Sequence, residues 1–290
     1  MKAINDLHDI VYQSFITEVN AYKPGNVSRY ADGHDMDIND FILSAEVSTP
    51  WLVKSDCLLG ERIYQAVAAT QKAVSCNTNL GMLLLFAPVL VTVQQYCQRQ
   101  IPMVRFQKDL QATIAGVSLE ESKKVFRAIA LASPGGLGNS EEHDINSSPD
   151  VSLLDAMTTA ESWDRVAWQF SHAYDDVINI GLSAIKDWAQ RWNSVEYAAV
   201  YAYLSFLSGV EDTHVKRKFG EQTAYDVSSQ AKKLLSHFRA VSSMAEIEPE
   251  INELDKKLKQ AGINPGTTAD LTAASVLLYL LIDCGILATP

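Results

Sequence analysis

Apolar residues recur every three or four positions along most of the chain, a spacing that places them on one face of an α-helix. The first such stripe predicts a helix over residues 3–21 and consists of Ile4, Leu7, Val11, Phe15 and Val19. This helix should end before Lys23-Pro24-Gly25, because proline lacks a backbone donor and glycine permits a turn. A second helix should begin near residues 37–40, where capping side chains gather, and turn Phe41, Ala45 and Trp51 inward.

The same spacing predicts further helices and no sheet. They are expected at 58–74, 79–98, 107–115, 119–132, 152–159, 162–191, 195–208, 222–243, 247–261 and 267–284. Ser118 and Glu121 form a capping-box pattern at the start of one of them, and Thr267 and Thr268 are candidate caps for the last. No segment alternates with period two between hairpin turns, and no repeat or linker divides the chain. We therefore expect an all-α fold in a single domain over residues 1–290.

Residues 133–150 are rich in Ser, Gly, Pro and Asn and are expected to form a functional loop within this domain. The SPGGLG segment at 133–138 could cradle a phosphate through its backbone amides, although it lacks the Lys-Ser/Thr of a P-loop. A mobile loop is the favoured interpretation of this segment, and the phosphate cradle is the alternative.

Residues 80–93 are the most apolar stretch of the chain. The stretch is only 14 residues long and contains Pro88, whereas a membrane-spanning helix needs about 20 residues. A fully buried helix is therefore favoured, and no membrane partner is expected.

The chain has 290 residues and a formal net charge of −11, with 47% hydrophobic residues. The acidic balance disfavours nucleic acid as a partner, since binding phosphates requires a basic surface. The apolar content disfavours disorder. The four cysteines are far apart, so neither a disulfide framework nor a zinc knuckle is predicted. Because the N-terminus carries charges where a signal peptide is apolar, we expect a soluble protein in a reducing, cytoplasmic location.

Five loops or helix edges are unusually polar for their surroundings. They lie at 18–29, 32–37 with Ser44, Glu46 and Ser48 after it, 75–81, 209–220 and 264–270. Taken singly, each could be an ordinary turn or helix cap. Asn77 and Asn79 need hydrogen-bond partners, because unpaired amides beside a buried helix are costly. Asp270 stands in a nearly apolar helix, which suggests a metal, a cation or a hydroxyl as its partner, with simple capping as the alternative.

These motifs occur in an informative order. KPGNV is followed by GHDMD before an F-x-x-S-A helix, then by NTNxG, by DTHV with basic residues, and by NPGxxADL. This order, from about residue 15 to 285, resembles the triphosphoribosyl-dephospho-CoA synthase family. Those enzymes make the precursor of the prosthetic group of citrate lyase and malonate decarboxylase.

The family motif T-P-K-P-G-L-V-D is similar to residues 21–28, and G-x-H-x-D-M-D is similar, in shortened form, to 33–37. N-T-H-K-G resembles 77–81, D-T-N-V resembles 212–215, Arg-Gly-Gly resembles 218–220, and S-P-G-G-S-A-D-L resembles 264–271. The chain departs from the family motifs at four positions, where Asp, His, Lys and Arg are replaced by Ser28, Asn79, Leu80 and Lys218. The chain is thus identified as a divergent member.

The resemblance implies a transferase that cleaves the adenine–ribose bond of ATP and transfers the triphosphoribosyl unit to a ribose hydroxyl of dephospho-CoA. A different nucleotide or another ribose-bearing acceptor remains open. Positive charge develops on the ribose as this bond breaks, and carboxylates can stabilise it or accept the hydroxyl proton. The triphosphate would need Mg²⁺, which prefers carboxylate and water ligands.

The site is expected where helix termini and loops converge. The candidate catalytic residues are Asp35, Asp37, Glu46, Asp212 and Asp270, and the candidate metal ligands are Asp35, Asp37, Asp212 and Asp270. The candidate substrate-binding residues are Lys23, Asn26, Asn77, Asn79, His214, Lys218, Thr267 and Thr268. Lys23 and Lys218 are expected to contact phosphate.

Two other functions remain open. One is a non-catalytic or regulatory helical protein that binds Mg-nucleotide, and the other is an N-glycosidic hydrolase in which water replaces the acceptor hydroxyl. The tryptophans expected on the long helix, among them Trp163 and Trp188, are interpreted as core or as the face of a homodimer.

Overall fold

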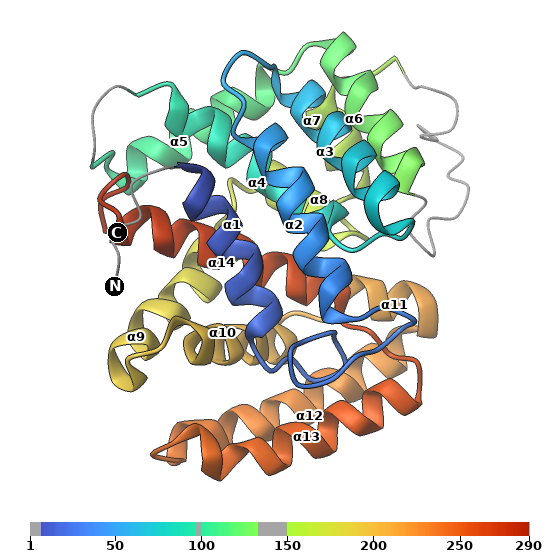
Figure 1. Cartoon of the computed structure of the whole chain (residues 1–290), viewed down its shortest axis with the longest axis vertical. Coiled ribbons are helices and arrows are strands. Elements are labelled where there is room, and N and C mark those ends of the chain that lie inside the picture. The colour runs from blue at the N-terminus through green and yellow to red at the C-terminus, as the bar shows by residue number, and fades with distance from the viewer. Residues whose placement is uncertain (1–6, 97–99, 133–149, 290) are drawn as a thin grey trace. The chain divides into compact units, whose positions relative to one another are not determined.

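The structure is a computed structural model that describes residues 7–96, 100–132 and 150–289. Within these residues it contains fourteen α-helices, one π-helical segment and no β-strand (Figure 1). The predicted all-α fold is confirmed. The loop expected at 133–150, including the SPGGLG segment, lies outside the described residues except for Asp150.

The chain divides into two compact units, each assembled from stretches that are far apart in the sequence. The first unit comprises Met1–Gln13, Asp40–Tyr174 and Leu280–Pro290, and the second comprises Ser14–Asn39 and Asp175–Tyr279. Helices α1 (Leu7–Asn20), α2 (Ile38–Leu52) and α14 (Gly266–Asp283) contribute residues to both units.

The first unit is organised around α4. Its other helices are α3 (Leu59–Val74), α5 (Met103–Ala115), α6 (Leu119–Ala132), α7 (Leu153–Ala160) and α8 (Arg165–Ser171). Helix α4 (Leu80–Gln94) packs against α3, α5 and α8, and twelve of its fifteen residues are buried. This confirms the prediction of a buried helix for the most apolar stretch. No helix among the described residues meets the length and hydropathy needed to cross a bilayer.

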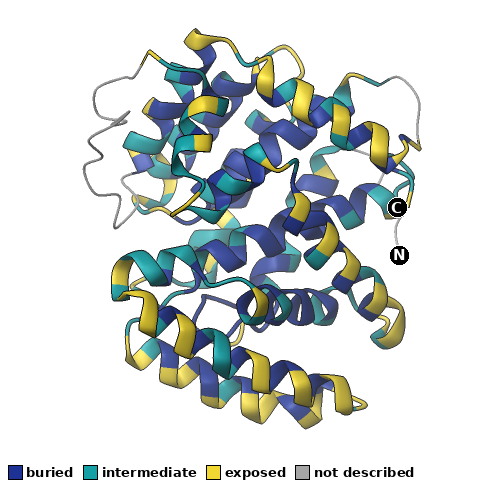
Figure 2. Cartoon of the chain, turned by 180° about the vertical axis from the view of Figure 1, so that it is seen from behind, coloured by how far each residue is buried: buried dark blue, intermediate teal, exposed yellow. Residues whose placement is uncertain are grey.

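The second unit contains the π-helical segment η2 (Val177–Leu182) and five helices of its own. They are α9 (Ser183–Trp192), α10 (Val195–Gly209), α11 (Thr213–Phe219), α12 (Glu221–Ala240) and α13 (Met244–Gln260). Helix α10 packs against both α9 and α12, while α12 and α13 lie side by side (Figure 1). Both α12 and α13 expose one face, shown in yellow in Figure 2. Trp188 is buried in this unit and stacks on Tyr201 with ring centroids 4.2 Å apart.

The single long helix predicted over 162–191 is wrong. Helix α8 ends at Ser171, and Ala173 and Tyr174 have φ values of 51° and 61°, which an α-helix does not allow. The Tyr174 ring is fully buried, and its hydroxyl donates to Leu85 O at 2.8 Å. Because burying this ring stabilises the turn, tertiary packing overrides the local helical pattern.

Candidate active site

Residues 23–26, here called the KPGN turn, form a type II β-turn after α1. Asn26 N donates to Lys23 O at 3.0 Å, and Gly25 has φ of 82°. Proline in the second position and glycine in the third are the residues that this turn type requires. A Cβ atom on Gly25 would lie 2.9 Å from both Leu258 Cδ1 and Pro265 Cδ, so space as well as φ requires glycine here.

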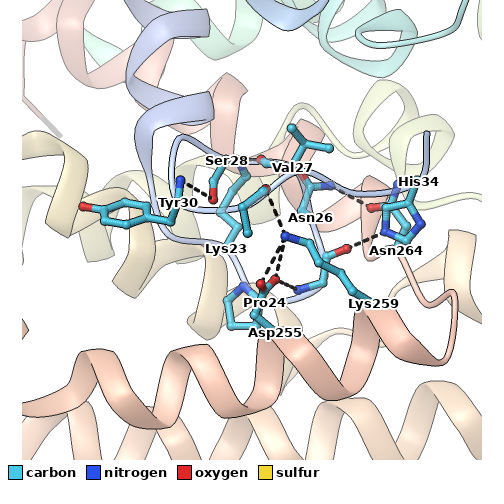
Figure 3. Close-up of polar contacts among 12 residues, drawn as sticks. Lys23, Pro24, Asn26, Val27, Ser28, Tyr30, His34, Asp255, Lys259 and Asn264 are labelled. Carbon is cyan, nitrogen blue, oxygen red and sulfur yellow. Dashed lines mark hydrogen bonds and ion pairs between the residues drawn. The ribbon is translucent and has the colours of Figure 1, made fainter. Parts of the chain in front are cut away.

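Side chains from three other segments hold the backbone of the KPGN turn, and Figure 3 shows two of them, His34 and Asp255. Tyr203 OH donates to Pro24 O at 2.8 Å, and His34 Nε2 lies 2.8 Å from Gly25 O. Gly25 N donates to Asp255 Oδ1 at 2.8 Å. The turn is therefore fixed by partners from α10, from the following loop and from α13.

Lys23, the first residue of the KPGN turn, is fully buried, and its side chain bonds to residues on both sides of the turn. Its Nζ donates to Glu18 O at 2.8 Å and to Val27 O at 3.0 Å, and it lies 2.9 Å from Glu18 Oε1. Burial raises the pKa of Glu18 and lowers that of Lys23, while the attraction between the two charges opposes both shifts. The prediction that Lys23 contacts phosphate is corrected, because an ammonium with three oxygens around it and no exposed surface has no donor left for a substrate.

Sequence reasoning missed Asp255 and Lys259 on α13. The Asp255 carboxylate accepts from Gly25 N and pairs with Lys259 Nζ at 3.1 Å, and Lys259 Nζ also donates to Ala31 O at 3.0 Å. The pair thus holds both ends of the segment from Gly25 to Ala31. A signal was present, since Asp255 follows Ile251 by four residues and so falls on the buried face of α13.

A second junction joins the N-termini of α11 and α14 through Asp212. This carboxylate is 3% exposed. Its Oδ1 accepts from Val215 N at 2.9 Å and so caps α11, while its Oδ2 accepts from both the amide and the hydroxyl of Thr268 at 2.7 Å. Burial raises the pKa of Asp212, and the bonds from Val215 and Thr268 oppose the shift. Three donors from the chain bond to this carboxylate and join the two helices, whereas a catalytic or metal-binding role of Asp212 stays a prediction.

The two threonines at the start of α14 are also engaged within the protein. Thr268 gives its amide and its hydroxyl to Asp212, and Thr267 Oγ1 lies 3.1 Å from Thr213 Oγ1. Both threonines are buried. Direct binding of phosphate by Thr268 is therefore corrected, because its donors already have an acceptor.

Cationic side chains gather beside this junction. His214 is half-buried, and Gly266 lies against it, since a Cβ atom on Gly266 would be 3.9 Å from His214 Cγ. Burial lowers the pKa of His214; Asp212 opposes that shift, while Arg217, Lys218 and His34 lower the pKa further. Lys218 is exposed on the last turn of α11. Burial, with smaller contributions from the neighbouring cations, therefore lowers the pKa of His214 and favours its neutral form.

The three remaining candidate carboxylates of this unit have different surroundings. Asp35 is exposed in a tight turn with φ of 61°, and Asp37 Oδ1 accepts from Asn39 N at 2.7 Å at the start of α2. Asp270 is half-buried, one turn into α14. Among the described residues, no three His, Cys, Asp or Glu side chains lie together as metal ligands do. The four carboxylates predicted as metal ligands therefore do not form a ready-made cage.

The first unit holds the NTN motif, which packs on α2. Thr78 Oγ1 donates to Ser44 Oγ at 2.6 Å, and Asn79 Nδ2 lies 3.4 Å from Ser48 Oγ. Asn77 is exposed and its Oδ1 accepts from Leu80 N at 3.1 Å at the start of α4. Asn79 is buried, so its amide has the partner that the sequence required, whereas substrate contact by Asn77 and Asn79 stays a prediction.

Glu46 does not join the NTN motif. Ser44 and Ser48 are one turn apart and share a face of α2, whereas Glu46 lies midway between them, about 200° around the helix axis. Its side chain is exposed, and its charge contributes to a raised pKa at Tyr12. The structure gives no geometric support for grouping Glu46 with these residues.

The second unit thus presents an all-helical scaffold in which two helix N-termini, a rigid turn and cationic side chains meet at one place. Helix N-termini together with His and Lys side chains favour anionic ligands. These features make this part of the second unit suited to an anionic ligand.

Comparison with known proteins identifies the family. The family model for CitG, ATP:dephospho-CoA triphosphoribosyl transferase, matches residues 4–286. The chain therefore belongs to the ATP:dephospho-CoA triphosphoribosyl transferase family, as the motif order predicted, and the class of its reaction is group transfer.

Two relatives from Vibrio cholerae, of strains M66-2 and ATCC 39315, support this membership. Each is named as a probable 2-(5''-triphosphoribosyl)-3'-dephosphocoenzyme-A synthase and is 23% identical over 94% of this chain and 87% of its own length. A crystal structure from Archaeoglobus fulgidus, provisionally named a triphosphoribosyl-dephospho-CoA synthase, shares 25% identity and a TM-score of 0.65. The similarity covers 83% of this chain and 97% of that one.

Proposed function

We propose that the protein transfers the triphosphoribosyl unit of MgATP to a ribose hydroxyl of dephospho-CoA, or of a related ribose-bearing acceptor, and releases adenine. The acceptor oxygen forms a bond to the anomeric carbon of ATP as the bond from that carbon to adenine breaks. Adenine leaves with the electron pair, and the hydroxyl proton passes to a carboxylate or to the departing base. The junction of α11 and α14, with His214 and Lys218 beside it, is the observation that carries this proposal.

His214 and Lys218 are proposed as the partners of the triphosphate. Both belong to α11, whose N-terminus Asp212 joins to that of α14. His214, neutral in the free protein, can gain a proton when phosphate oxygens approach. Lys218 supplies a flexible ammonium group.

Mg²⁺ is proposed to arrive with the triphosphate. Mg²⁺ keeps several waters and is commonly held by substrate phosphates with one or two carboxylates, so it does not require a cage built by the protein. Asp35 is the exposed carboxylate available for such a contact, and Asp37 and Asp270 are candidates for the proton acceptor.

Release of adenine tests the proposal. The protein is incubated with MgATP, with and without dephospho-CoA, and free adenine is measured by chromatography. We expect adenine only when the acceptor is present. Release of adenine without acceptor would indicate hydrolysis instead of transfer. Tight binding of MgATP without release of adenine would favour a regulatory nucleotide-binding protein.

Lys218→Met is expected to raise the KM for MgATP about tenfold and to flatten its dependence on salt, because one cation beside the triphosphate is lost. Stability should change by less than about 0.5 kcal/mol, since the side chain is exposed. Lys216→Met is the matched control: it lies on the same helix but pairs with Glu211 and Glu221 at the surface. Equal effects of both substitutions would contradict a specific role for Lys218.

Binding of MgATP is expected to take up a proton at His214 near neutral pH. The free protein holds the pKa of His214 below its ordinary value, and bound phosphate raises it, so affinity should increase as the pH falls toward about 6. Calorimetric titration in two buffers of different ionisation enthalpy measures the uptake. His214→Gln should abolish the difference in observed binding enthalpy between the two buffers. His237→Gln changes an exposed histidine beside Glu250 and should preserve that difference. Uptake that survives in His214→Gln would assign the proton elsewhere.

A further inference from the structure

The amide of Asn26, the last residue of the KPGN turn, is only half used by the protein. The side chain is 6% exposed, and its Nδ2 donates to Asn264 Oδ1 at 2.8 Å (Figure 3). Its Oδ1 is buried and has no hydrogen-bond partner among the described residues. A buried oxygen without a donor costs about 1–3 kcal/mol, so its partner is a donor that the described chain does not supply, either a water or a group of a ligand.

This oxygen belongs to the same neighbourhood as the cationic side chains. Asn264, its amide partner, stands two residues before Gly266, and Gly266 lies against His214. His34, which adds to the positive potential at His214, lies 2.8 Å from the carbonyl of Gly25. The ligand that reaches Asn26 Oδ1 must therefore combine a hydrogen-bond donor with negative charge.

The Asn26 amide points its Nδ2 toward Asn264. Because Asn264 Oδ1 accepts from Asn26 Nδ2, the oxygen of Asn26 is the atom left over. The rigid turn keeps this oxygen in place, since the flanking Gly25 is held through both its amide and its carbonyl. A fixed acceptor of this kind discriminates strongly between a ligand that carries a hydroxyl and one that lacks it.

We propose that Asn26 Oδ1 accepts a hydrogen bond from a ribose hydroxyl of a bound substrate and thereby selects ribose over deoxyribose. The inference rests on the proposed function, because a nucleotide brings a ribose hydroxyl together with phosphate groups. The ribose can belong to ATP or to the acceptor, and the experiment separates these sources.

The test compares substrates that lack one hydroxyl. The KM values of ATP, 2'-deoxyATP and 3'-deoxyATP are measured with dephospho-CoA, and calorimetry compares the binding of the acceptor with that of its 2'-deoxy and 3'-deoxy analogues. The wild-type protein should prefer one hydroxyl-bearing substrate by about tenfold or more. The position of the preferred hydroxyl identifies the ribose involved.

Two variants assign the preference to Asn26. Asn26→Leu introduces a side chain of nearly equal shape. It should remove the preference by lowering the affinity only for the hydroxyl-bearing substrate. In Asn264→Asp the carboxylate still accepts a hydrogen bond from Asn26 Nδ2, so this variant should keep the preference. Its added negative charge should lower the affinity for all anionic substrates alike. Thermal unfolding confirms that both variants are folded.

Three results would overturn the inference. They are a wild-type protein without any preference, an Asn26→Leu variant that keeps the preference, and an Asn26→Leu variant that weakens all substrates equally. The last result would mean that the amide serves only the protein or a bound water. Absence of MgATP binding to the wild-type protein in calorimetry would instead refute the proposed function itself, which keeps the two failures apart.

Discussion

Lys23→Met is expected to lower the free energy of unfolding by about 3–5 kcal/mol, because it leaves the buried Glu18 carboxylate without its cation. The carbonyls of Glu18 and Val27 lose their donor at the same time, so the KPGN turn loosens and activity falls with stability. Urea unfolding measures the first effect, and adenine release at a temperature where the variant is folded measures the second.

Lys256→Met is the control for removing a lysine from the same unit. Lys256 is exposed on α13, and its replacement should change stability by less than about 0.5 kcal/mol. If Lys23→Met kept its stability and lost only nucleotide affinity, Lys23 would be a ligand of phosphate after all.

Asp212→Ala is expected to lower the free energy of unfolding by about 3 kcal/mol or more. The substitution removes the cap of α11 and leaves the amide and hydroxyl of Thr268 buried without an acceptor. Asp212→Asn should be intermediate, because one amide oxygen still accepts while the new NH₂ group faces donors. Chemical denaturation measures the free energy of unfolding of both variants and checks this order of stability. Glu211→Ala, at a half-exposed neighbouring residue, is the control.

Thr268→Val separates a positioning role of Asp212 from a catalytic one. It keeps the backbone amide but removes one of the two bonds to Asp212 Oδ2. If Asp212 positions the junction, Thr268→Val should reproduce part of the loss in both stability and kcat. A variant Asp212→Asn with unchanged stability and no turnover would make Asp212 a catalytic residue instead.

The helices were predictable wherever one amphipathic period runs between clear caps. Residues 119–132 form α6 as expected, and Glu121 N donates to Ser118 Oγ at 3.3 Å as the capping pattern predicted. Helix α11 was missed because seven residues are too few to show a period. The sequence signals of this helix were the cap Asp212, the basic residues of its last turn and Gly220 after it. Gly220 has φ of 87° in the structure.

The polar segments of the site were predictable as a group, but their roles were not. Lys23 and Asp212 have residue types suited to a ligand and a base, yet both are engaged by groups of the chain itself. Which partner a side chain finds depends on residues far along the sequence, as with Asp255 and Gly25, and no local pattern records that choice. Asn26 was selected for its position, whereas the unpartnered oxygen emerged only from the packing.

The partners of the KPGN turn also set the order in which this protein can be completed during synthesis. Pro24, Gly25 and Asn26 are made early, but their partners Tyr203, Asp255 and Asn264 follow 179, 230 and 238 residues later. At ribosomal rates of about 5–20 residues per second, the turn waits roughly 10 to 50 s for these side chains. During that interval Lys23 remains hydrated on a nascent chain. A polypeptide that ends before α13 lacks Asp255 and Asn264, so its KPGN turn has only His34, Tyr203 and local contacts to hold it.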